Sequence, residues 1–278
     1  MITNRLMKRT ELDVVLDWAA AEGWNPGLDD AEAFWATDPE GFFVAEQQGE
    51  LLAAISVVRH SKSFAFLGLY ICQAEHRGRG IGLSLWNDAI AHAGNRTVGL
   101  DGVAEQQANY ERSGFKRVGA TTRYSGRPSA LSDNRVVDAT DADISELIAL
   151  EATASGWKKQ TYLSHWFAPT ANRQTVVIRE DENIVAAATF RRCREGVKIG
   201  PFLAKHAQLA APLLQHISAC VDAEIIIDVP AEASDVALIC QKQNMLPIFG
   251  TARMFRGTIA EPAAEASFLC CPSTLELG

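Results

Sequence analysis

The sequence lacks the features that mark membrane and secreted proteins. Its 278 residues contain no run of about 18 apolar residues, the length at which a membrane-spanning helix becomes a candidate. The opening residues, Met1-Ile2-Thr3-Asn4-Arg5, do not begin the long apolar stretch of a secretory signal. We therefore predict no contact with a membrane and expect a cytoplasmic protein.

Motifs for disulfides and metals are also missing. The six cysteines are scattered, none of them forms a CxxC pair, and the histidine or acidic neighbours of a zinc site are absent. We predict reduced thiols and no bound metal. Two of these residues, Cys270 and Cys271, fall in a C-terminal stretch that we expect to be exposed.

Positive charge is scarce. Lys and Arg number 26 against 34 Asp and Glu, which gives a formal net charge of -8. A general nucleic-acid binder needs a basic stripe, so this balance argues against nucleic acid as a partner. It suits a cationic substrate slightly better than an anionic one, although the local charge of a site decides that point.

What the sequence does contain is an alternation of helix and strand patterns. Its length suggests about two domains, and 47% hydrophobic residues allow a core of ordinary size. Apolar spacing of three and four predicts helices, and short apolar runs between turn residues predict strands. In the first half, the expected helices cover residues 12–19, 29–36, 83–93 and 106–113, and the expected strands cover 42–45, 51–58, 64–72, 97–100 and a stretch from 115.

The second half repeats this order. Its expected helices cover residues 144–151, 209–221 and 236–243, and its expected strands cover 175–178, 184–190, 198–204, 224–229 and 251–255. Segments are also similar in sequence: Leu67-Gly68-Leu69 resembles Ile199-Gly200-Pro201, Leu100-Asp101-Gly102 resembles Ile227-Asp228-Val229, and Arg123-Tyr124-Ser125-Gly126 resembles Met254-Phe255-Arg256-Gly257. We predict a duplicated α/β chain with a mixed sheet flanked by helices in each half, residues 1–127 and 134–260, followed by a loosely held tail at 261–278.

A glycine-rich turn, Arg77-Gly78-Arg79-Gly80-Ile81-Gly82, joins a predicted strand to the following helix. Glycine adopts positive φ and lets a ligand approach closely, and the unpaired N–H groups of a helix start attract a pyrophosphate. A dinucleotide-binding GxGxxG would need glycine where Leu83 stands, and no G-K-S/T follows. The turn therefore predicts a phosphate site that is neither a Rossmann fingerprint nor a hydrolytic P-loop.

This turn resembles the signature Q/R-x-x-G-x-G/A of the GCN5-related N-acetyltransferase (GNAT) family. A second family element, a short helix ending in Tyr-Glu-Lys-x-Gly-Phe, resembles Tyr110-Glu111-Arg112-Ser113-Gly114-Phe115, with arginine for lysine. The resemblance covers residues 3 to 126, although the family often has asparagine and proline where Val103 and Ala74 stand. It implies a mixed α/β fold and acetyl-CoA-dependent N-acetyl transfer, and the tandem layout resembles a two-domain bacterial branch.

The resemblance also implies where the donor lies. Acetyl-CoA would pair with the backbone of Tyr70, Ile71 and Cys72, where an N–H group would face the thioester oxygen. Cys72 is expected to be a strand residue and not a nucleophile, because the family forms no acyl-enzyme. The remaining donor contacts are expected from Arg77, Gly78, Arg79, Gly80, Ile81, Gly82, Leu83 and Asn109.

Tyr110 stands where the family places its general acid, which would protonate the leaving thiolate. Packing on the cofactor is the alternative role. A charged amine of pKa about 10.4 must also lose a proton, and the candidates for that base are Asp101, which could equally cap a turn, and Glu46, which could also bind the amine. Trp24 and Asn25 fall in a loop that resembles the acceptor-binding loop, where Trp24 could instead close the core.

The second half lacks both motifs. Lys205-His206-Ala207-Gln208 stands in place of the turn, and Cys240-Gln241-Lys242-Gln243 in place of the tyrosine. We therefore predict one CoA site, in the first half, and a degenerate second half that serves packing, dimerisation or the acceptor pocket. The acceptor would be a small-molecule or peptide amine, and a homodimer is compatible with the sequence. The alternatives are a non-catalytic acyl-CoA sensor, which the intact tyrosine disfavours, and an aminoacyl transferase, which the acidic charge and the intact CoA turn disfavour.

Overall fold

The computed structural model describes residues 1–259 and 268–278. The helices in these ranges are α1 (Arg9–Ala21), α2 (Asp30–Thr37), α3 (Ile81–Ala89), α4 (Gln107–Arg112), α5 (Ile144–Ser155), α6 (Gln160–Phe167), α7 (Ala207–Cys220) and α8 (Ser234–Lys242). The strands are β1 (Thr3–Leu6), β2 (Phe42–Gln47), β3 (Glu50–Arg59), β4 (Phe64–Cys72), β5 (Thr97–Gly102), β6 (Lys116–Gly126), β7 (Val136–Asp138), β8 (Arg173–Glu180), β9 (Asn183–Arg192), β10 (Val197–Ala204), β11 (Ile225–Pro230), β12 (Leu246–Arg256) and β13 (Leu269–Cys271).

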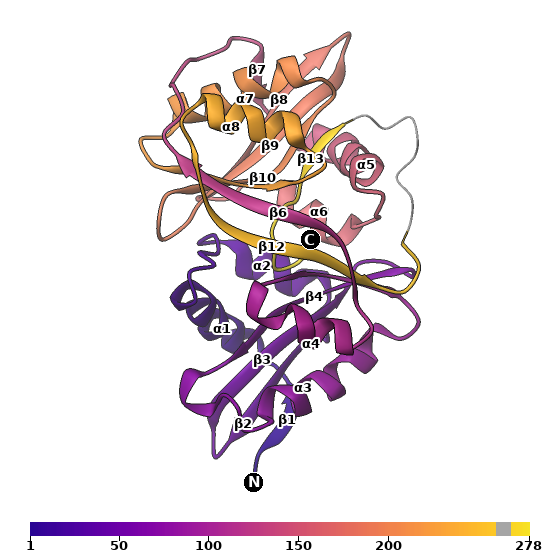
Figure 1. Cartoon of the computed structure of the whole chain (residues 1–278). Coiled ribbons are helices and arrows are strands. Elements are labelled where there is room, and N and C mark those ends of the chain that lie inside the picture. Colours follow the sequence, from indigo (N-terminus) through magenta and orange to yellow (C-terminus); the bar gives the residue numbers. More distant parts are fainter. Residues whose placement is uncertain (260–267) are drawn as a thin grey trace.

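The two halves share one sheet. Its order is β1-β2-β3-β4-β5-β12-β6-β11-β10-β9-β8-β7, with β13 beside β10. Strand β12 of the second half pairs with β5 of the first, and β6 of the first half pairs with β11 of the second. The exchanged strands β6 and β12 run next to each other across the middle of the molecule (Figure 1). The predicted mixed sheet flanked by helices is confirmed, and the division into residues 1–127 and 134–260 stays a prediction about the duplication, because the sheet runs through both.

The register of β6 and β12 shows how the halves correspond. Arg123 of β6 pairs with Asp228 of β11 and Arg253 of β12 pairs with Asp101 of β5, so Arg123 corresponds to Arg253 and the repeat offset at this point is 130 residues. The alignment of the two halves by sequence, which matched Arg123 with Met254, was wrong by one residue because it did not include the strand pairing.

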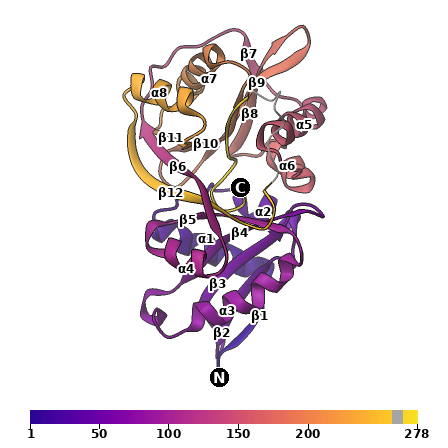
Figure 2. The same ribbon diagram turned by 45° about the vertical axis from the view of Figure 1, so that its right-hand side comes forward.

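Helices cover both faces of the sheet (Figure 2). Side chains of α1, α2, α5 and α6 meet in one core that joins the halves. Helices α3 and α4 cover the other face of the first half, and α7 and α8 cover that of the second. This arrangement places the gap between β4 and β5 beside the start of α3.

Some elements were missed from the sequence. Strands β1, β7 and β13 are three or four residues long and helix α6 has eight, too short for a clear apolar period. Their formation depends on tertiary pairing: β1 on β2, β7 on β8, and β13 on β10.

The expectation of a loose C-terminal tail was wrong for its described part, and residues 260–267 lie outside the described residues. Strand β13 pairs with β10, Cys271 is buried, and Leu277 is fully buried in the core that joins the halves. Two glycines leave room for this segment, because a Cβ at Gly68 would stand 1.9 Å from the Glu276 carbonyl oxygen and one at Gly200 2.4 Å from that of Pro272. The packing rests on contacts distant in sequence, so composition alone suggested exposure.

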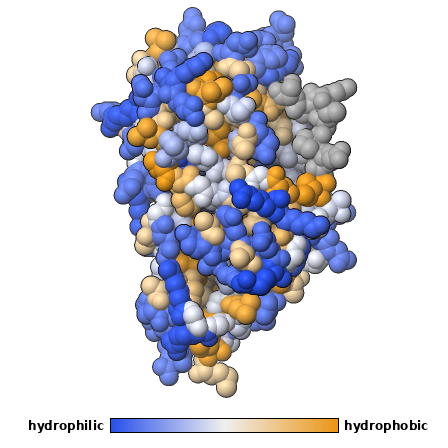
Figure 3. Space-filling model, in the orientation of Figure 1, coloured by the Kyte–Doolittle hydropathy of each residue, from blue (hydrophilic) through white to orange (hydrophobic). Residues whose placement is uncertain are grey.

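The molecular surface agrees with the ordinary composition. On the face in Figure 3, hydrophilic residues dominate and hydrophobic ones are scattered in small groups. Among the described helices, none combines the length and the apolar character needed to cross a bilayer.

Candidate active site

The site begins where β4 and β5 separate. The two strands are paired in parallel at Phe64–Phe66 and Thr97–Gly99 and not beyond. Leu69 has φ +46, and the pairing of β4 with β3 shifts register around it. The part of β4 that follows therefore has no partner strand on its β5 side among the described residues, which leaves backbone groups there free for another partner.

The glycine turn follows β4 directly. Gly78 and Gly80 have φ of +75 and +79, the left-handed region that favours glycine, and Gly80 is the N-cap of α3. A Cβ at either position would meet nothing within 4 Å, so both open toward free space. A Cβ at Gly82 would stand 2.8 Å from the Tyr70 hydroxyl, so the tyrosine lies over the helix start. This bare helix start has the properties of a phosphate cradle.

The two arginines of the turn are engaged with protein groups. The Arg77 guanidinium donates to the Cys72 carbonyl oxygen over 2.8 Å and forms an ion pair with Glu22. Arg79 lies 3.0 Å from His76 Nδ1. Arg77 thus ties the turn to the end of β4 and to the residue that follows α1, while Arg79 stays exposed beside the turn.

Two adjoining hollows surround this point. The outer groove, of about 610 Å³, is lined by the turn, Tyr70, Ile71, Cys72 and Leu83. The inner cavity, of about 60 Å³, lies deeper, between Leu67–Tyr70 of β4 and Leu100–Asp101 of β5. The residues that line both are Trp24, Tyr70, Val103, Gln106 and Phe249.

Tyr110 lines the inner cavity from α4. It is 6% exposed, its ring stacks on Trp86 at 5.6 Å, and it packs against Gly102. Burial raises the pKa of Tyr110, and Tyr70 adds to the rise. The phenol therefore keeps its proton at neutral pH and can donate it, as a general acid must.

Asp101 does not provide a free base. Both of its carboxylate oxygens accept hydrogen bonds from Arg253, at 2.8 and 2.7 Å, and the side chain has no exposed area. Burial raises the pKa of Asp101, and the neighbouring Arg253 opposes that rise. The exchanged strand β12 brings this arginine to β5, a partner that the first half alone could not reveal. Its counterpart in the second half is Arg123 with Asp228.

The predicted roles of Glu46 and Asn25 are not supported. Glu46 accepts a hydrogen bond from Arg5 over 2.7 Å and lines neither hollow. Asn25 bonds to the backbone of Glu195 through both its amide nitrogen and its oxygen, so it holds the loop against the second half. Glu46 was placed from its strand, without the register that sets its position in the sheet.

The other predicted residues vary in position. Trp24 lines both hollows, and its carbonyl oxygen accepts hydrogen bonds from Arg123 and Lys198, each at 3.1 Å. Asn109 is exposed and bonds to Gln106 and Arg112 on its own helix. Burial raises the pKa of the Cys72 thiol, which disfavours a nucleophilic role.

The second half has a corresponding gap, between β10 and β11, but a segment of the chain occupies it. Strands β10 and β11 pair only at Val197–Ile199 and Ile225–Ile227, and β13 then pairs with β10 at Phe202–Ala204. Helix α7 has His206 as its N-cap, in extended conformation, and no glycine turn precedes it. The segment 268–278 therefore lies where the first half keeps its gap open.

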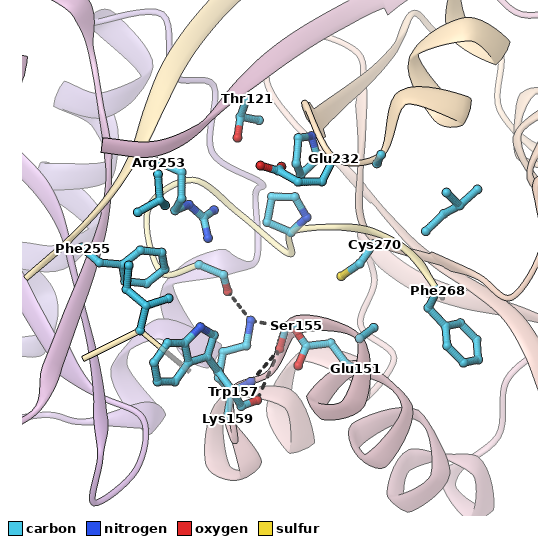
Figure 4. Close-up of a pocket in the computed structure, with 18 of the residues that line it drawn as sticks. Thr121, Glu151, Ser155, Trp157, Lys159, Glu232, Arg253, Phe255, Phe268 and Cys270 are labelled. Atoms are coloured by element: carbon cyan, nitrogen blue, oxygen red, sulfur yellow. Dashed lines mark hydrogen bonds and ion pairs between the residues drawn. The ribbon is translucent and has the colours of Figure 1, made fainter. Parts of the chain in front are cut away.

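A separate cavity of about 470 Å³ lies beside that segment (Figure 4). Trp157 stacks on Phe64 at 4.2 Å along one wall, and Lys159 forms a 2.7 Å ion pair with Glu151. Lys159 also donates to the Gly278 carbonyl oxygen over 2.8 Å. This cavity lacks a glycine turn and a tyrosine among its lining residues, so it offers no counterpart of the first-half chemistry.

Sequence reasoning missed the residues that the exchanged strands and the C-terminal segment bring to the inner cavity. These are Arg123, Phe249, Thr251, Leu275 and Glu276. The available signal was the repeated glycine at Gly68 and Gly200, which marks close approach of another backbone.

Comparison with known proteins agrees with this geometry. The model of the acetyltransferase (GNAT) family matches residues 10–115, and that of an acetyltransferase (GNAT) domain matches residues 147–268. A holothin acyltransferase from Pseudoalteromonas sp. (strain SANK 73390) is 32% identical over 285 residues, covering 99% of this chain and 94% of the relative. The uncharacterized N-acetyltransferase YitH of Bacillus subtilis is 22% identical over 240 residues, 83% of this chain and 84% of its own.

Solved structures share the fold. A putative acetyltransferase from Pyrococcus horikoshii superposes with a TM-score of 0.83 at 16% identity, over 100% of this chain and 96% of the other. A GCN5-related N-acetyltransferase from Sphaerobacter thermophilus gives 0.62 at 14% identity, over 95% and 98%. With two GNAT models in tandem and an acyltransferase relative along its whole length, the chain belongs to the GNAT acetyltransferase family and is an acyltransferase.

Proposed function

We propose that this protein transfers an acetyl group from acetyl-CoA to a primary amine. The observation that carries the proposal is the left-handed glycine turn at the start of α3, opening into a groove that continues to a protonated, buried tyrosine. The Gly78, Gly80 and Gly82 backbone would hold the pyrophosphate, and the unpaired side of β4 would pair with the pantetheine arm. Acetyl-CoA supplies an acyl group on a thiol that leaves readily.

The residues of this chain divide the remaining work. Backbone N–H groups of Tyr70, Ile71 or Cys72 would face the thioester oxygen, a contribution of about 2.7–4 kcal/mol in comparable sites. Tyr110 would give its proton to the departing sulfur. Trp24 and Phe249, which line both hollows, would exclude water from the path between them.

The donor is proposed to bind in the first half only. The second-half gap holds β13, and its helix start carries His206 in place of glycine. A second donor would have to displace a strand whose last residue, Cys271, is completely buried.

The acceptor is proposed to enter the inner cavity between the halves. Its walls are largely apolar, which suits an amine on a compact apolar body. Because the Pseudoalteromonas relative is named for holothin, that compound belongs in the panel of candidate acceptors.

The test is to incubate the purified protein with acetyl-CoA and a panel of alkyl amines, aryl amines, peptides and holothin, and to follow acetylated products by mass spectrometry. We expect product from at least one amine, with Tyr110→Phe much slower. Binding of acetyl-CoA without product from any amine would favour the acyl-CoA sensor.

A further inference from the structure

The inner cavity contains a second carboxylate, Glu276, from the segment that follows β13. Asp101, the other acid there, is held by Arg253 through both oxygens. Glu276 is 3% exposed, and its Oε2 has no hydrogen-bond partner among the described residues. Within those same residues it forms no ion pair. Burying a carboxylate without a partner is costly, so its position calls for an explanation.

The backbone around Glu276 is firmly positioned. Leu277 N–H donates to Thr274 Oγ1 over 2.9 Å, and the Leu277 carbonyl oxygen lies 2.8 Å from His60 Nε2. The Leu277 side chain is fully buried, and the Glu276 carbonyl oxygen passes over Gly68. The backbone that carries Glu276 is therefore held in place where this residue lines the inner cavity.

Charged groups from four neighbouring strands surround Glu276. Arg123 on β6, Arg191 on β9 and Lys198 on β10 lie close enough to interact with Glu276 electrostatically; burial lowers the pKa of Lys198, and Glu276 opposes that fall. Each already has an acid within 4 Å: Arg123 and Lys198 have Asp228, and Arg191 has Asp30. Asp101 on β5 also senses the Glu276 charge. The cations therefore lie near Glu276 without forming an ion pair with it among the described residues.

Resting on the proposed acetyl transfer, we propose that Glu276 is the general base that takes the proton from the acceptor amine. The amine nitrogen forms a bond to the thioester carbon, the carbon–sulfur bond breaks, and its electron pair leaves on sulfur. Before the attack, Glu276 takes one proton from the ammonium group and passes it to water, which leaves the nitrogen a free electron pair. After the attack, Glu276 takes a second proton from the nitrogen while Tyr110 gives one to sulfur. Proton exchange with water then restores both side chains, so no other reactant is needed.

The same site defines the class of acceptor. A carboxylate attracts an ammonium group, and the surrounding Trp24, Leu100 and Leu275 are apolar. The small volume, about 60 Å³, admits the amine and the start of its carbon chain. We infer a primary alkyl amine on a compact apolar body, which arrives charged and needs the base.

The experiment compares Glu276→Gln with wild type on the fastest alkyl amine of the acceptor panel, phenethylamine being tried first, and on aniline, which is neutral at pH 7. We expect kcat on the alkyl amine to fall about 100-fold, the lower end for a general base. The KM for acetyl-CoA and the rate on aniline should change only slightly. The Glu276→Gln rate on the alkyl amine should also keep rising about tenfold per pH unit to about pH 9, because the amine must then lose its proton in solution.

A second variant guards against misfolding. Glu276→Asp keeps the charge among the cations but withdraws it by one methylene, and its kcat should fall about tenfold. Glu232→Gln, a carboxylate beside the separate cavity, is the matched control and should behave as wild type.

Full activity of Glu276→Asp, or equal losses on alkyl amine and aniline, would overturn the role of Glu276 while leaving acetyl transfer intact. Absence of product from wild type with every amine would overturn both proposals.

Discussion

In the first half, strands β4 and β5 separate after Phe66 and the gap opens to the outer groove, whereas in the second half β10 and β11 separate after Ile199 and β13 enters the gap. Both gaps have a glycine on the strand, Gly68 or Gly200, and in each half an exchanged strand, β12 or β6, pairs with the far side of β5 or β11. One fold can therefore either keep a ligand site or fill the same space with its own chain.

The difference also shows which residues the segment that fills the second gap brings to the proposed site in the first half. The segment that fills the second gap continues past Gly200 to Gly68 and brings Leu275 and Glu276 to the inner cavity of the first. The Trp24 carbonyl oxygen accepts hydrogen bonds from Arg123 of the exchanged strand β6 and from Lys198 of β10, so the second half helps to fix the loop over the site.

The largest expected effect is a loss of CoA affinity on substitution at the start of α3 but not at the start of α7. Gly80→Asp forces a side chain into φ +79 and sets a negative charge against the pyrophosphate, so affinity for CoA should fall about 10³-fold, or about 4 kcal/mol. His206→Asp, at the corresponding N-cap of α7, should leave CoA affinity unchanged. Isothermal titration calorimetry measures both, and equal effects at the two positions would contradict the comparison.

The next largest effect is a loss of stability on breaking the ion pair that each exchanged strand forms, Arg253 with Asp101 or Arg123 with Asp228. Arg253→Met leaves the buried Asp101 without a cation within 4 Å among the described residues, so the free energy of unfolding should fall by about 3 kcal/mol. Arg123→Met should cost less, because Lys198 remains 3.9 Å from Asp228. Urea unfolding followed by circular dichroism checks the order, and a larger loss in Arg123→Met would reverse it.

Tyr110 and Cys240 occupy equivalent positions in the two halves. The Tyr110 carbonyl oxygen accepts a hydrogen bond from the Phe115 N–H over 3.0 Å, and the Cys240 carbonyl oxygen accepts one from the Met245 N–H over 2.9 Å. Tyr110→Phe should lower kcat about 10²-fold with little change in CoA affinity, because only the proton is removed. Cys240→Ala should leave kcat unchanged. Steady-state kinetics on the best amine decides, and an unaltered kcat in Tyr110→Phe would reduce the tyrosine to a packing role.

The smallest expected effect is a loss of folding stability at acid pH that originates from His60 in the first half. Burial, with a contribution from Lys159, lowers the pKa of His60 to about 3. Above the ordinary value of about 6.5, His60 is neutral in both states. As pH falls below that value, His60 takes up a proton in the unfolded chain but stays neutral in the folded one. The free energy of unfolding should therefore drop by about 2 kcal/mol between pH 7 and pH 5.

His60→Gln should remove this part of the slope. Cys193 stands at the corresponding end of β9, so the second half carries no such titration there. Unfolding midpoints across pH provide the measurement, and an unchanged slope in His60→Gln would assign the acid sensitivity elsewhere.

The sequence alone predicted the long elements of both halves, the glycine turn and Tyr110, because these depend on local period and on residues close in the chain. It did not reveal the partner of Asp101, because the pairing with Arg253 joins residues distant in the chain through strand exchange. It also missed Glu276, since the segment 268–278 folds against both halves and has no periodic pattern of its own. The exchanged strands and the C-terminal segment share one cause, contacts that only the complete sheet defines.

The central claim is that one donor site exists per chain, at the first glycine turn. Titration of the full-length protein with acetyl-CoA, together with Gly80→Asp and His206→Asp, tests it most directly. The account predicts one acetyl-CoA per chain in wild type and in His206→Asp, and none in Gly80→Asp. Two bound per wild-type chain, or binding retained by Gly80→Asp and lost in His206→Asp, would contradict it.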